Sequence, residues 1–531
     1  MKRHITYCFV ILLCLGQINA QEILPVQNNP QEEIIRRQQL ALDSSRYLLS
    51  DRSLMVRPVS LQKTKFTQQG FTIKPLPFQY LTEYDLNRPF AYANGALLPN
   101  KGWQFYYTTG VEVRSPNFVF RFQPEYVWAF NGQFEGFPSG HDQVLWNSYY
   151  NWLNKIDLPE RFSAEPIRKF YPGQSRAQLM LGSLAIGYST ENLWWGPGRF
   201  SSLVMSNNAP GFEHGTFHSE EPIKTPIGTF EFDYVWAGRL KSSGELPPET
   251  NRAYNNIYLY QPKLENRKRF FTGGVLSWQP KWLKGLFVGF DAASIYYETM
   301  PTKRSTMGSL MGRYILPAEK AEVYMQYGRS DKFTTAWNVF QDTIPRGFLA
   351  GIRKMFPLSN KVGQKKNPAY LQLGIEMVQL QVPNVSLIRQ AKSWYTSDLI
   401  RQGFTNEGQV LGAPIGPGSN TQRLEIAWVK GASKIGLEVE RWLHNADFYY
   451  HYNITSGSMD YNRQWVDLSS SLVWNFPYRH WQWFGQFSVV RSINYQWFAL
   501  IPGASQGDAY FDNGLDEINV HGRFGLLYTW K

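Results

Sequence analysis

Residues 103–128 read WQFYYTTGVEVRSPNFVFRFQPEYVW. Up to Val113 the odd positions carry apolar or neutral side chains, while the positions between them include Gln104 and Glu112. After the turn-like residues 115–117 the aromatic rings occupy even positions, beginning at Phe118, and alternate with charged or amide groups. Because successive side chains of a strand point to opposite faces, this stretch predicts a β-hairpin with one apolar and one charged face.

The same two-residue period returns near residues 230–239, 371–377, 423–428 and 435–440, and again in residues 524–530 at the C-terminus. A soluble sandwich would have to bury the charged face of these strands, whereas the wet lumen of a membrane barrel accepts it. The fold class is therefore predicted to be all-β and transmembrane, a single antiparallel outer-membrane β-barrel. At about 24 residues per strand and connection, the chain after Lys101 has room for about 18 strands.

Composition agrees with a barrel. Aromatic residues make up 16% of the chain, yet the mean hydropathy is only -0.38. Such a chain suits strands with one lipid face, one wet face and aromatic girdles. After the N-terminus no apolar run approaches the roughly 18 residues that a spanning helix needs.

The first twenty residues have the pattern of a secretory signal peptide, with a basic start, an apolar core and a small residue at Ala20. Lipoprotein processing at Cys14 is an alternative, but the bulky Leu13 before it disfavours that reading. Both cysteines of the chain, Cys8 and Cys14, would leave with the signal, so the mature protein is predicted to have no thiol chemistry. The expected location is the outer membrane, exposed at the cell surface.

The formal net charge is +12. This excess favours polyanionic partners, namely acidic polysaccharide and lipopolysaccharide, and outside the cell nucleic acid is not expected. An alternative is that the cations simply face anionic outer-membrane lipid headgroups.

Two segments have helical rather than strand spacing, Gln31 to Leu49 and His141 to Lys155. If the strand at Trp103 is the first to run outward, the insert at residues 129–176 lies on the periplasmic side beside the first helix. The predicted organisation is a signal at 1–20, a periplasmic region with a helix at 21–100, and a barrel at 101–531. We expect the two helices to plug the inner mouth together.

Candidate sugar-binding residues follow the next predicted strand, at about 178–188. Rings can stack on a pyranose, amides offer paired donors and acceptors, and Arg can grip a carboxylate. The candidate residues are Trp194, Trp195, Arg199, Asn207 and Asn208, together with Asn406 and Asn420 in a second Gly-rich loop. The alternatives are that the two Trp belong to a girdle, that Gly196-Pro197-Gly198 only shapes a turn, and that the second loop is an ordinary connection.

Three segments carry a family resemblance. They are the run from Glu191 to Arg199, which contains WWGPG and precedes the Ser- and Asn-rich residues 206–212, the region 94–126, and the region 405–420. In this order they resemble the Wzi-type capsule-assembly outer-membrane family. The resemblance implies a surface lectin, a closed barrel with a periplasmic helical plug, that binds capsular or extracellular polysaccharide and helps attach or assemble the capsule.

We expect a monomeric binding protein that is not an enzyme, with no cofactor, no metal and no catalytic residue. His214 and His218 have the spacing of a zinc helix, but Gly215 stands where the catalytic Glu of such a motif should be. The alternative functions are a porin or channel for small solutes and, third, an outer-membrane hydrolase. Bilayer conductance would separate a lectin with a plugged lumen from a channel.

Overall fold

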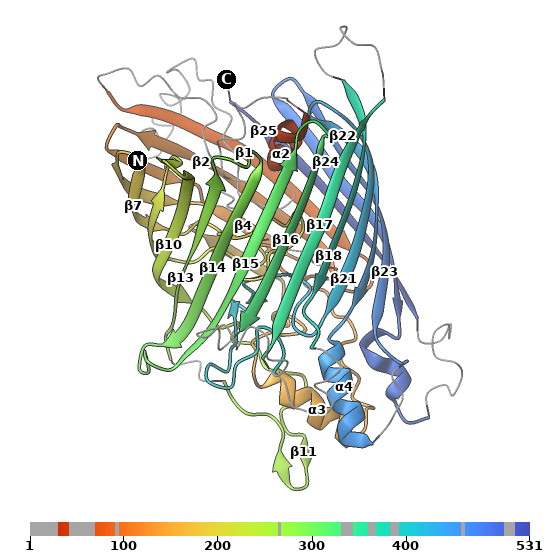
Figure 1. Ribbon diagram of the computed structural model, residues 1–531. Helices are drawn as coiled ribbons and strands as arrows, with labels where there is room; N and C mark the ends of the chain where they lie inside the picture. The colour runs from red at the N-terminus through yellow and green to blue at the C-terminus, as the bar shows by residue number, and fades with distance from the viewer. Residues whose placement is uncertain are drawn as a thin grey trace, which may run out of the picture.

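A computed structural model describes residues 30–41, 70–90, 95–263, 267–330, 344–358, 368–382, 392–457, 462–503 and 516–530. Of the described strand segments, 21 form one antiparallel sheet that closes on itself, because β1 (Thr72–Asp85) pairs with both β2 (Gly102–Arg114) and β25 (Glu517–Tyr528) (Figure 1). Three strands are each interrupted into two segments, so the barrel has 18 strands. The predicted fold class and strand number are confirmed.

The wall of the barrel consists of β1 (Thr72–Asp85), β2 (Gly102–Arg114), β3 (Phe118–Phe122), β4 (Glu125–Ala129), β5 (Ile167–Tyr171), β6 (Arg176–Leu181), β7 (Leu184–Ser189), β8 (His214–Ser219), β9 (Ile223–Thr225), β10 (Gly228–Leu240), β13 (Arg269–Pro280), β14 (Leu286–Tyr297), β15 (Arg304–Leu316), β16 (Ala321–Ser330), β17 (Arg346–Pro357), β18 (Ala369–Gln379), β21 (Asn420–Lys430), β22 (Ser433–Leu443), β23 (Val466–Tyr478), β24 (Trp481–Ile493) and β25 (Glu517–Tyr528). The remaining described elements are α2 (Pro30–Ala41), α3 (Gln143–Leu153), α4 (Ala446–Ser456), the 3-10 helix η3 (Tyr495–Leu500), and two short ribbons, β11 (Ala253–Tyr254) with β12 (Ile257–Tyr258) and β19 (Thr405–Asn406) with β20 (Gln409–Val410).

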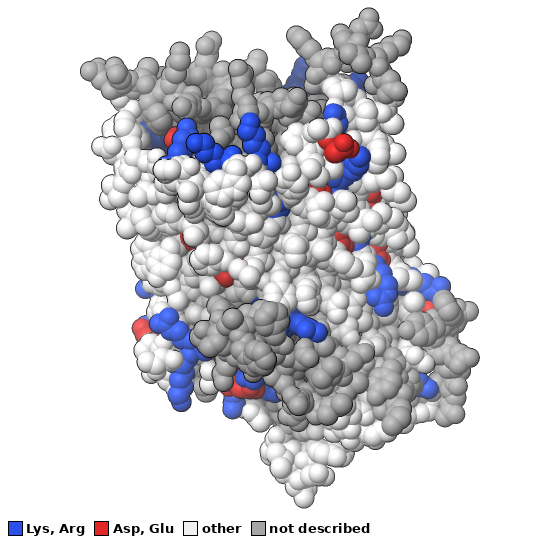
Figure 2. All heavy atoms as spheres, viewed as in Figure 1, with Lys and Arg blue, Asp and Glu red and all other residues white. Residues whose placement is uncertain are grey.

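Strand alternation separates the two faces as expected. In β2 the rings of Trp103 and Tyr107 are exposed on the outside, whereas Gln104 and Glu112 are buried on the inside. On the face seen in Figure 2, charged side chains gather towards the two ends and uncharged atoms predominate between them. No helix among the described residues is long and apolar enough to cross a membrane.

The two ends of the barrel differ. The turn end is where β1 begins and β25 ends, and its connections include the short turns 115–117, 182–183, 431–432 and 479–480. The opposite end, the loop end, carries long connections that include residues 130–166 and 241–268. In Figure 1 the turn end is at the top, and α3, α4 and β11 lie at the bottom.

Strand β1 corrects the predicted boundaries. It starts at Thr72, so the barrel does not begin at residue 101, and the sequence hid this strand because Pro75 and Pro77 cannot donate to a strand ladder. The pairing of β1 with β2 tolerates them through a register shift between Leu76 and Gln79. Because the barrel has one strand before β2, each later strand runs in the opposite direction to the one predicted with the strand at Trp103 as the first.

The predicted placement of the helical insert beside the first helix is therefore wrong. The insert spans only residues 130–166, because β5 and β6 belong to the wall, and its helix α3 lies at the loop end (Figure 1). Helix α2 lies at the other end of the barrel, so the two helices are not neighbours. Both helices themselves are confirmed, although residues 42–49 of the first prediction, like the predicted signal at 1–20, lie outside the described residues.

The single strand predicted at residues 178–188 is also wrong. Residues 182–183 form a turn that divides it into the hairpin β6–β7, with Leu181 opposite Leu184. Gly182 has φ of 67°, a backbone conformation that glycine adopts without strain. The exposed residues change from odd positions (Leu179, Leu181) to even positions (Ile186, Tyr188) across this turn.

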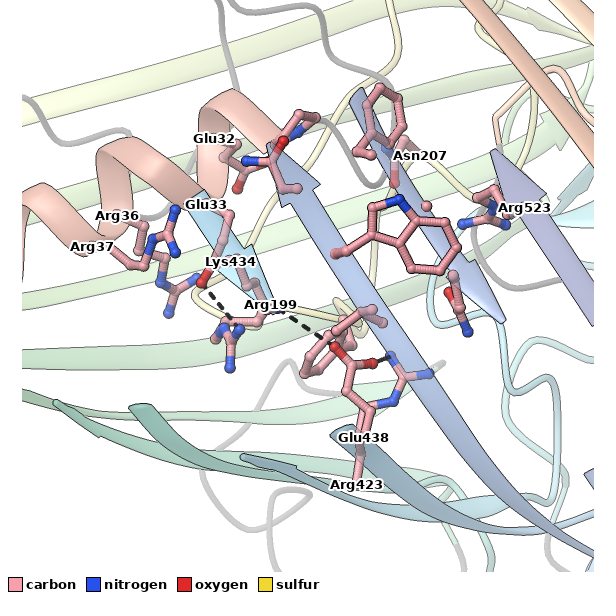
Figure 3. A pocket seen from close by; sticks show the side chains of 18 of the residues that line it. Glu32, Glu33, Arg36, Arg37, Arg199, Asn207, Arg423, Lys434, Glu438 and Arg523 are labelled. Carbon is pink, nitrogen blue, oxygen red and sulfur yellow. Dashed lines mark hydrogen bonds and ion pairs between the residues drawn. The ribbon is translucent and has the colours of Figure 1, made fainter. Parts of the chain in front are cut away.

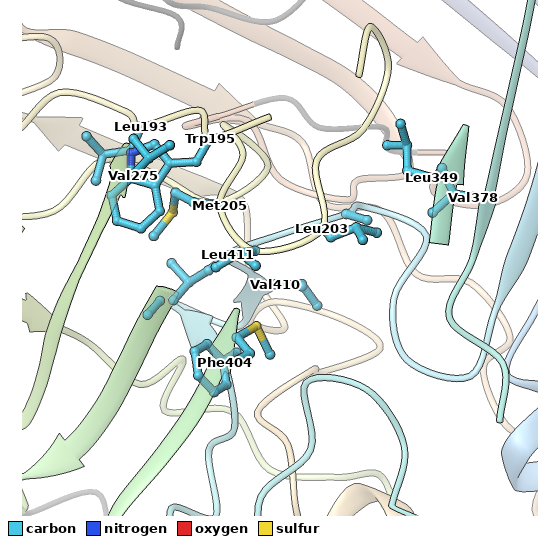
Figure 4. Close-up of a cluster of buried hydrophobic side chains, with 14 of the residues drawn as sticks. Leu193, Trp195, Leu203, Met205, Val275, Leu349, Val378, Phe404, Val410 and Leu411 are labelled. Carbon is cyan, nitrogen blue, oxygen red and sulfur yellow. The ribbon is translucent and has the colours of Figure 1, made fainter. Parts of the chain in front are cut away.

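Two loops fill the lumen with an apolar core. Residues 190–213 supply Trp195 and Leu203, and residues 392–419 supply Phe404 and Leu411, all at most 2% exposed. Figure 4 shows these side chains packed towards wall residues such as Val275. Each fully buried side chain of this kind contributes roughly 1.5–3 kcal/mol, so the loops are held firmly inside. Inward-folded loops, rather than α3, make up the packed interior.

Candidate functional site

A cavity of about 270 Å³ opens among the loops at the loop end of the barrel. It lies between the connection after β1, the insert 130–166, residues 408–419 and the chain around α4 and η3. We call it the aromatic cleft, because Trp and Tyr rings dominate its lining. Its rings belong to Phe90, Phe134, Tyr149, Trp152, Phe162, Trp442, His444, Trp465, Tyr495 and Trp497.

The centre of this lining is a stack of three rings. His444 lies between Trp442 and Trp465, with ring centroids 4.2 and 3.8 Å away and interplanar angles of 25° and 9°. Trp442 and His444 flank the end of β22, and Trp465 directly precedes β23, so adjacent strands deliver the stack. All three rings are partly exposed and offer flat apolar surface.

Trp497 continues the aromatic wall from the next loop. Its ring meets Trp465 edge-on, with centroids 5.5 Å apart, and only 3% of the residue is exposed. Its φ of 57° and the φ of 49° at Gln496 are left-handed values that bulky residues rarely adopt. Such strain persists only where the surrounding structure imposes it, and it is common at functional sites.

Two indole donors of the cleft lack an acceptor. Among the described residues no hydrogen-bond partner lies within reach of the buried Nε1 of Trp152 or of Trp497. A buried indole N–H normally finds a partner. Both residues line the cleft.

The charges in the cleft compensate one another. Arg88 is the only Lys or Arg among the described lining residues, and its Nη2 lies 3.3 Å from Oδ1 of Asp467. Oδ2 of the same carboxylate lies 2.9 Å from Nε2 of His444. Glu160 accepts hydrogen bonds from Tyr149 Oη at 2.5 Å and Phe137 N at 3.0 Å, and burial raises its pKa. The cleft therefore has no spare cation with which to select an acidic group.

Most of the predicted sugar-binding residues lie elsewhere. Trp195 is 1% exposed inside the lumen, where its ring packs against Phe271 and its Nε1 lies 3.4 Å from Asp233. Trp194, Arg199 and Asn207 line a different cavity, the lumen cavity beside α2 (Figure 3). The structure thus places these four residues away from the loop end.

The glycine-proline run next to them has a structural task. A Cβ on Gly198 would lie 1.9 Å from the carbonyl oxygen of Ser201, so only glycine fits this turn. The carbonyls of Pro197 and Gly198 accept hydrogen bonds from Arg36 of α2, at 2.7 and 3.3 Å. Arg199 lies 2.8 Å from Glu425 of the wall and 3.3 Å from Glu33 of α2. The segment therefore fastens α2 inside the barrel.

The three remaining candidates are divided between the cleft and the interior. Asn208 lines the aromatic cleft, with its Nδ2 donating to the carbonyl of Val410 at 2.8 Å. Asn406 is 1% exposed and donates to the carbonyl of Pro210 at 3.1 Å. Asn420 begins β21 and donates to Gln381 at 2.9 Å. Only Asn208 of the seven predicted residues lies in the cleft.

Sequence reasoning missed the rings that make the cleft. Trp442 and Trp465 are separated by 22 residues that contain α4, and nothing in their spacing shows that they stack on one His. A usable signal was their position, since each lies just where an alternating strand gives way to a polar segment. Aromatic residues of the membrane-interface girdle occupy the same positions, so position alone does not distinguish a sugar-binding ring from a girdle ring.

Metal chemistry finds no support in the described part of the chain, where no three of His, Cys, Asp and Glu gather closely enough to hold an ion. His214 and His218 lie on strand β8, not on a helix, and both are buried. Nε2 of His218 lies 3.3 Å from Glu220.

No protein-family model and no curated protein matches this chain. Among solved structures it is similar to Wzi of Escherichia coli, an outer-membrane carbohydrate-binding β-barrel involved in group 1 capsule assembly. The two chains are 11% identical, the match covers 86% of this chain and 85% of that chain, and the TM-score is 0.56. It is also similar to OccK8 (OprE) of Pseudomonas aeruginosa at 9% identity, with 87% of this chain and 98% of that chain covered and a TM-score of 0.40. A BenF-like porin of Pseudomonas fluorescens matches at 8% identity, with 86% of this chain and 98% of that chain covered and a TM-score of 0.39. At these identities the comparisons establish the fold alone, and the chain has the architecture of an outer-membrane β-barrel like that of Wzi.

Proposed function

We propose that this protein is an outer-membrane lectin that binds capsular or extracellular polysaccharide in the aromatic cleft and helps attach or assemble the capsule. The observation that carries the proposal is the cleft itself, with its stack of partly exposed rings and two further indoles whose N–H groups have no acceptor within the described residues. The similarity to Wzi, a carbohydrate-binding β-barrel, supports it.

The arrangement of the connections supports exposure of the cleft at the cell surface. Outer-membrane barrels have short turns on the periplasmic side and long loops outside. Here the short turns lie at the end where β1 begins and β25 ends, and the cleft lies among the long loops at the other end. In that orientation the ligand reaches the cleft from the medium.

The chemistry of the cleft favours a neutral sugar ring. Pyranose C–H faces pack on flat rings such as Trp442 and Trp465, and indole N–H groups donate to hydroxyl oxygens. Arg88 is already occupied by Asp467, so a carboxylate on the sugar would find no free partner there. We infer that a neutral residue of the polymer enters the cleft, while the acidic character of the polymer as a whole stays a prediction.

A channel function is disfavoured by the packed lumen. Trp195, Leu203 and Phe404 belong to one continuous apolar core that fills the interior. Small polar solutes have no wet path through such a core. We therefore propose a binding protein without an enzymatic or transport step.

Binding to neutral and uronic oligosaccharides, measured by calorimetry on the detergent-folded protein, tests the proposal. Trp465→Ala removes one face of the ring stack and should weaken neutral-sugar binding by about tenfold, equivalent to about 1.4 kcal/mol. Trp497→Phe keeps a ring but loses the N–H, and should weaken it a few-fold. The matched control is Trp282→Ala, because Trp282 is 64% exposed at the turn end.

Equal losses in Trp465→Ala and Trp282→Ala would show that the cleft is not the sugar site. In cells, a deletion strain should shed its polysaccharide into the medium. A deletion strain that keeps all its polysaccharide at the surface would contradict the role in attachment.

A further inference from the structure

A second cavity lies inside the barrel, away from the aromatic cleft. This lumen cavity has a volume of about 140 Å³ and lies between α2, the loop 190–213 and the wall strands β21 to β25 (Figure 3). Two of its lining residues, Lys434 and Asn475, are close in space to the turn 431–432, which places the cavity near the turn end.

Cations outnumber carboxylates in its lining. The cationic residues are Arg36, Arg37, Arg199, Arg423, Lys434 and Arg523, and the acidic ones are Glu32, Glu33 and Glu438. Carboxylates of the lining and the surrounding wall pair with five of the six cations. The pairs are Arg36 with Glu322, Arg199 with Glu425, Arg423 with Glu440, Lys434 with Glu425 and Arg523 with Glu83.

Arg37 is the exception. It is 4% exposed, and its one hydrogen bond runs from Nη2 to the carbonyl oxygen of Ala432 at 3.3 Å. Its Nε and Nη1 are buried and have no hydrogen-bond partner in the part of the chain that the structure describes. A buried guanidinium with unused donors is unfavourable unless an anion meets it.

The surroundings of Arg37 strengthen this conclusion. Burial holds the pKa of its guanidinium below the ordinary value, Glu33 and Glu425 oppose that shift, and the nearby cations Arg353 and Arg199 add to it. Glu33 is already engaged, since Arg353 lies 2.8 Å from it. Glu425 is engaged as well, since Arg199 lies 2.8 Å from it, and Arg37 forms no ion pair with either carboxylate within the described residues.

We propose that the lumen cavity binds an oxyanion, a phosphate or a carboxylate, on Arg37. Arg is well suited to both groups because its N–H donors match their oxygens. The anion could be free phosphate or an acidic group on a glycan that enters from the turn end. The site lies at the opposite end from the aromatic cleft, so either proposal can fail without the other.

Calorimetric titration of the detergent-folded full chain with inorganic phosphate, and separately with oligogalacturonate, tests this site. We expect saturable binding of at least one of them, weakened about tenfold or more in Arg37→Gln and in Arg37→Met. Arg239→Gln is the matched control, since it removes the same charge from a side chain that is 71% exposed. Heat-modifiable gel mobility checks that each variant barrel is folded.

Binding of phosphate alone assigns the site to the free ion, and binding of oligogalacturonate assigns it to an acidic glycan. Binding that is unchanged in both Arg37 variants, or equally weakened in Arg239→Gln, overturns the proposal. Absence of binding of either probe to the wild-type protein overturns it as well.

Discussion

The aromatic cleft and the lumen cavity use opposite chemistry in one barrel. The cleft is built from rings on the loops, and its single arginine, Arg88, is neutralised by Asp467. The lumen cavity is built from charges on α2 and the wall, and within the described residues Arg37 forms no ion pair there. The difference teaches that the net charge of the chain does not show what the loop end recognises, because the one arginine of the cleft is paired with a carboxylate while Arg37 in the lumen is not.

The largest expected effect comes from removing the core that separates the two sites. Replacing residues 191–212 with a short Gly-Ser linker should open the lumen and raise single-channel conductance in a planar bilayer by at least about tenfold, because a barrel of this size otherwise encloses an aqueous channel. Wild-type protein should show little current. Equal conductance of the two proteins would show that this loop does not close the lumen.

The second prediction concerns the charged network around α2. Glu322 lies 3.1 Å from Arg36, 2.5 Å from Arg313 and 2.7 Å from Arg353. Glu322→Gln leaves buried cations without their partner and should cost about 3–5 kcal/mol of stability, measured by urea unfolding of the folded barrel. Glu319→Gln, an exposed matched control that pairs with Lys354, should cost less than about 1 kcal/mol. Similar costs would contradict a special role for the network.

The third prediction is a pH dependence at the loop end. Burial raises the pKa of Asp447 at the start of α4 to about 6, although it accepts hydrogen bonds from Ser393 and Val382. The folded state therefore binds the proton more tightly than the unfolded chain, so this contribution to stability is present below about pH 4 and is lost as pH rises through 6.

Limited proteolysis of wild type against Asp447→Asn should resolve this contribution, on the order of 2–3 kcal/mol between pH 4 and pH 7. The comparison is needed because buried His141, whose pKa is lowered to about 4, acts in the opposite direction. Identical pH profiles of the two proteins would contradict the assignment to Asp447.

The smallest expected effect is a difference in salt dependence between ligand binding in the aromatic cleft and in the lumen cavity. Raising the NaCl concentration should change neutral-sugar binding in the cleft by less than about twofold, while oxyanion binding at Arg37 should fall several-fold, because counter-ions compete for and screen its charge. Both are measured by the same calorimetric titrations. Strong salt dependence of sugar binding would show that an ionic contact dominates the cleft.

The sequence predicted the barrel because the two-residue period is a local property. Trp103 faces outward and Gln104 inward simply because they are neighbours on one strand. Strand number followed from length, and α3 from its local spacing. The sequence failed at β1, where Pro75 and Pro77 obscured the pattern, and that single omission reversed the predicted side of α3.

The candidate site was predicted far less well. The WWGPG run looked like a sugar platform because its residue types suit one, yet it folds inward and holds α2 through Arg36 and Arg199. Asn208 alone of the predicted residues lies in the cleft. Residue type shows what a side chain can bind, whereas burial decides whether a ligand can reach it.

Local alternation, turn residues and length by themselves determined that this protein is a barrel of about 18 strands with one apolar and one polar face. Only the tertiary structure decided which loops fold inward, which rings meet around His444 and which arginine is left without an anion. The physical reason is distance along the chain. A strand face depends on adjacent residues, but the contacts of Trp442 with Trp465 through His444, or of Arg37 with Ala432, exist only after the sheet has closed.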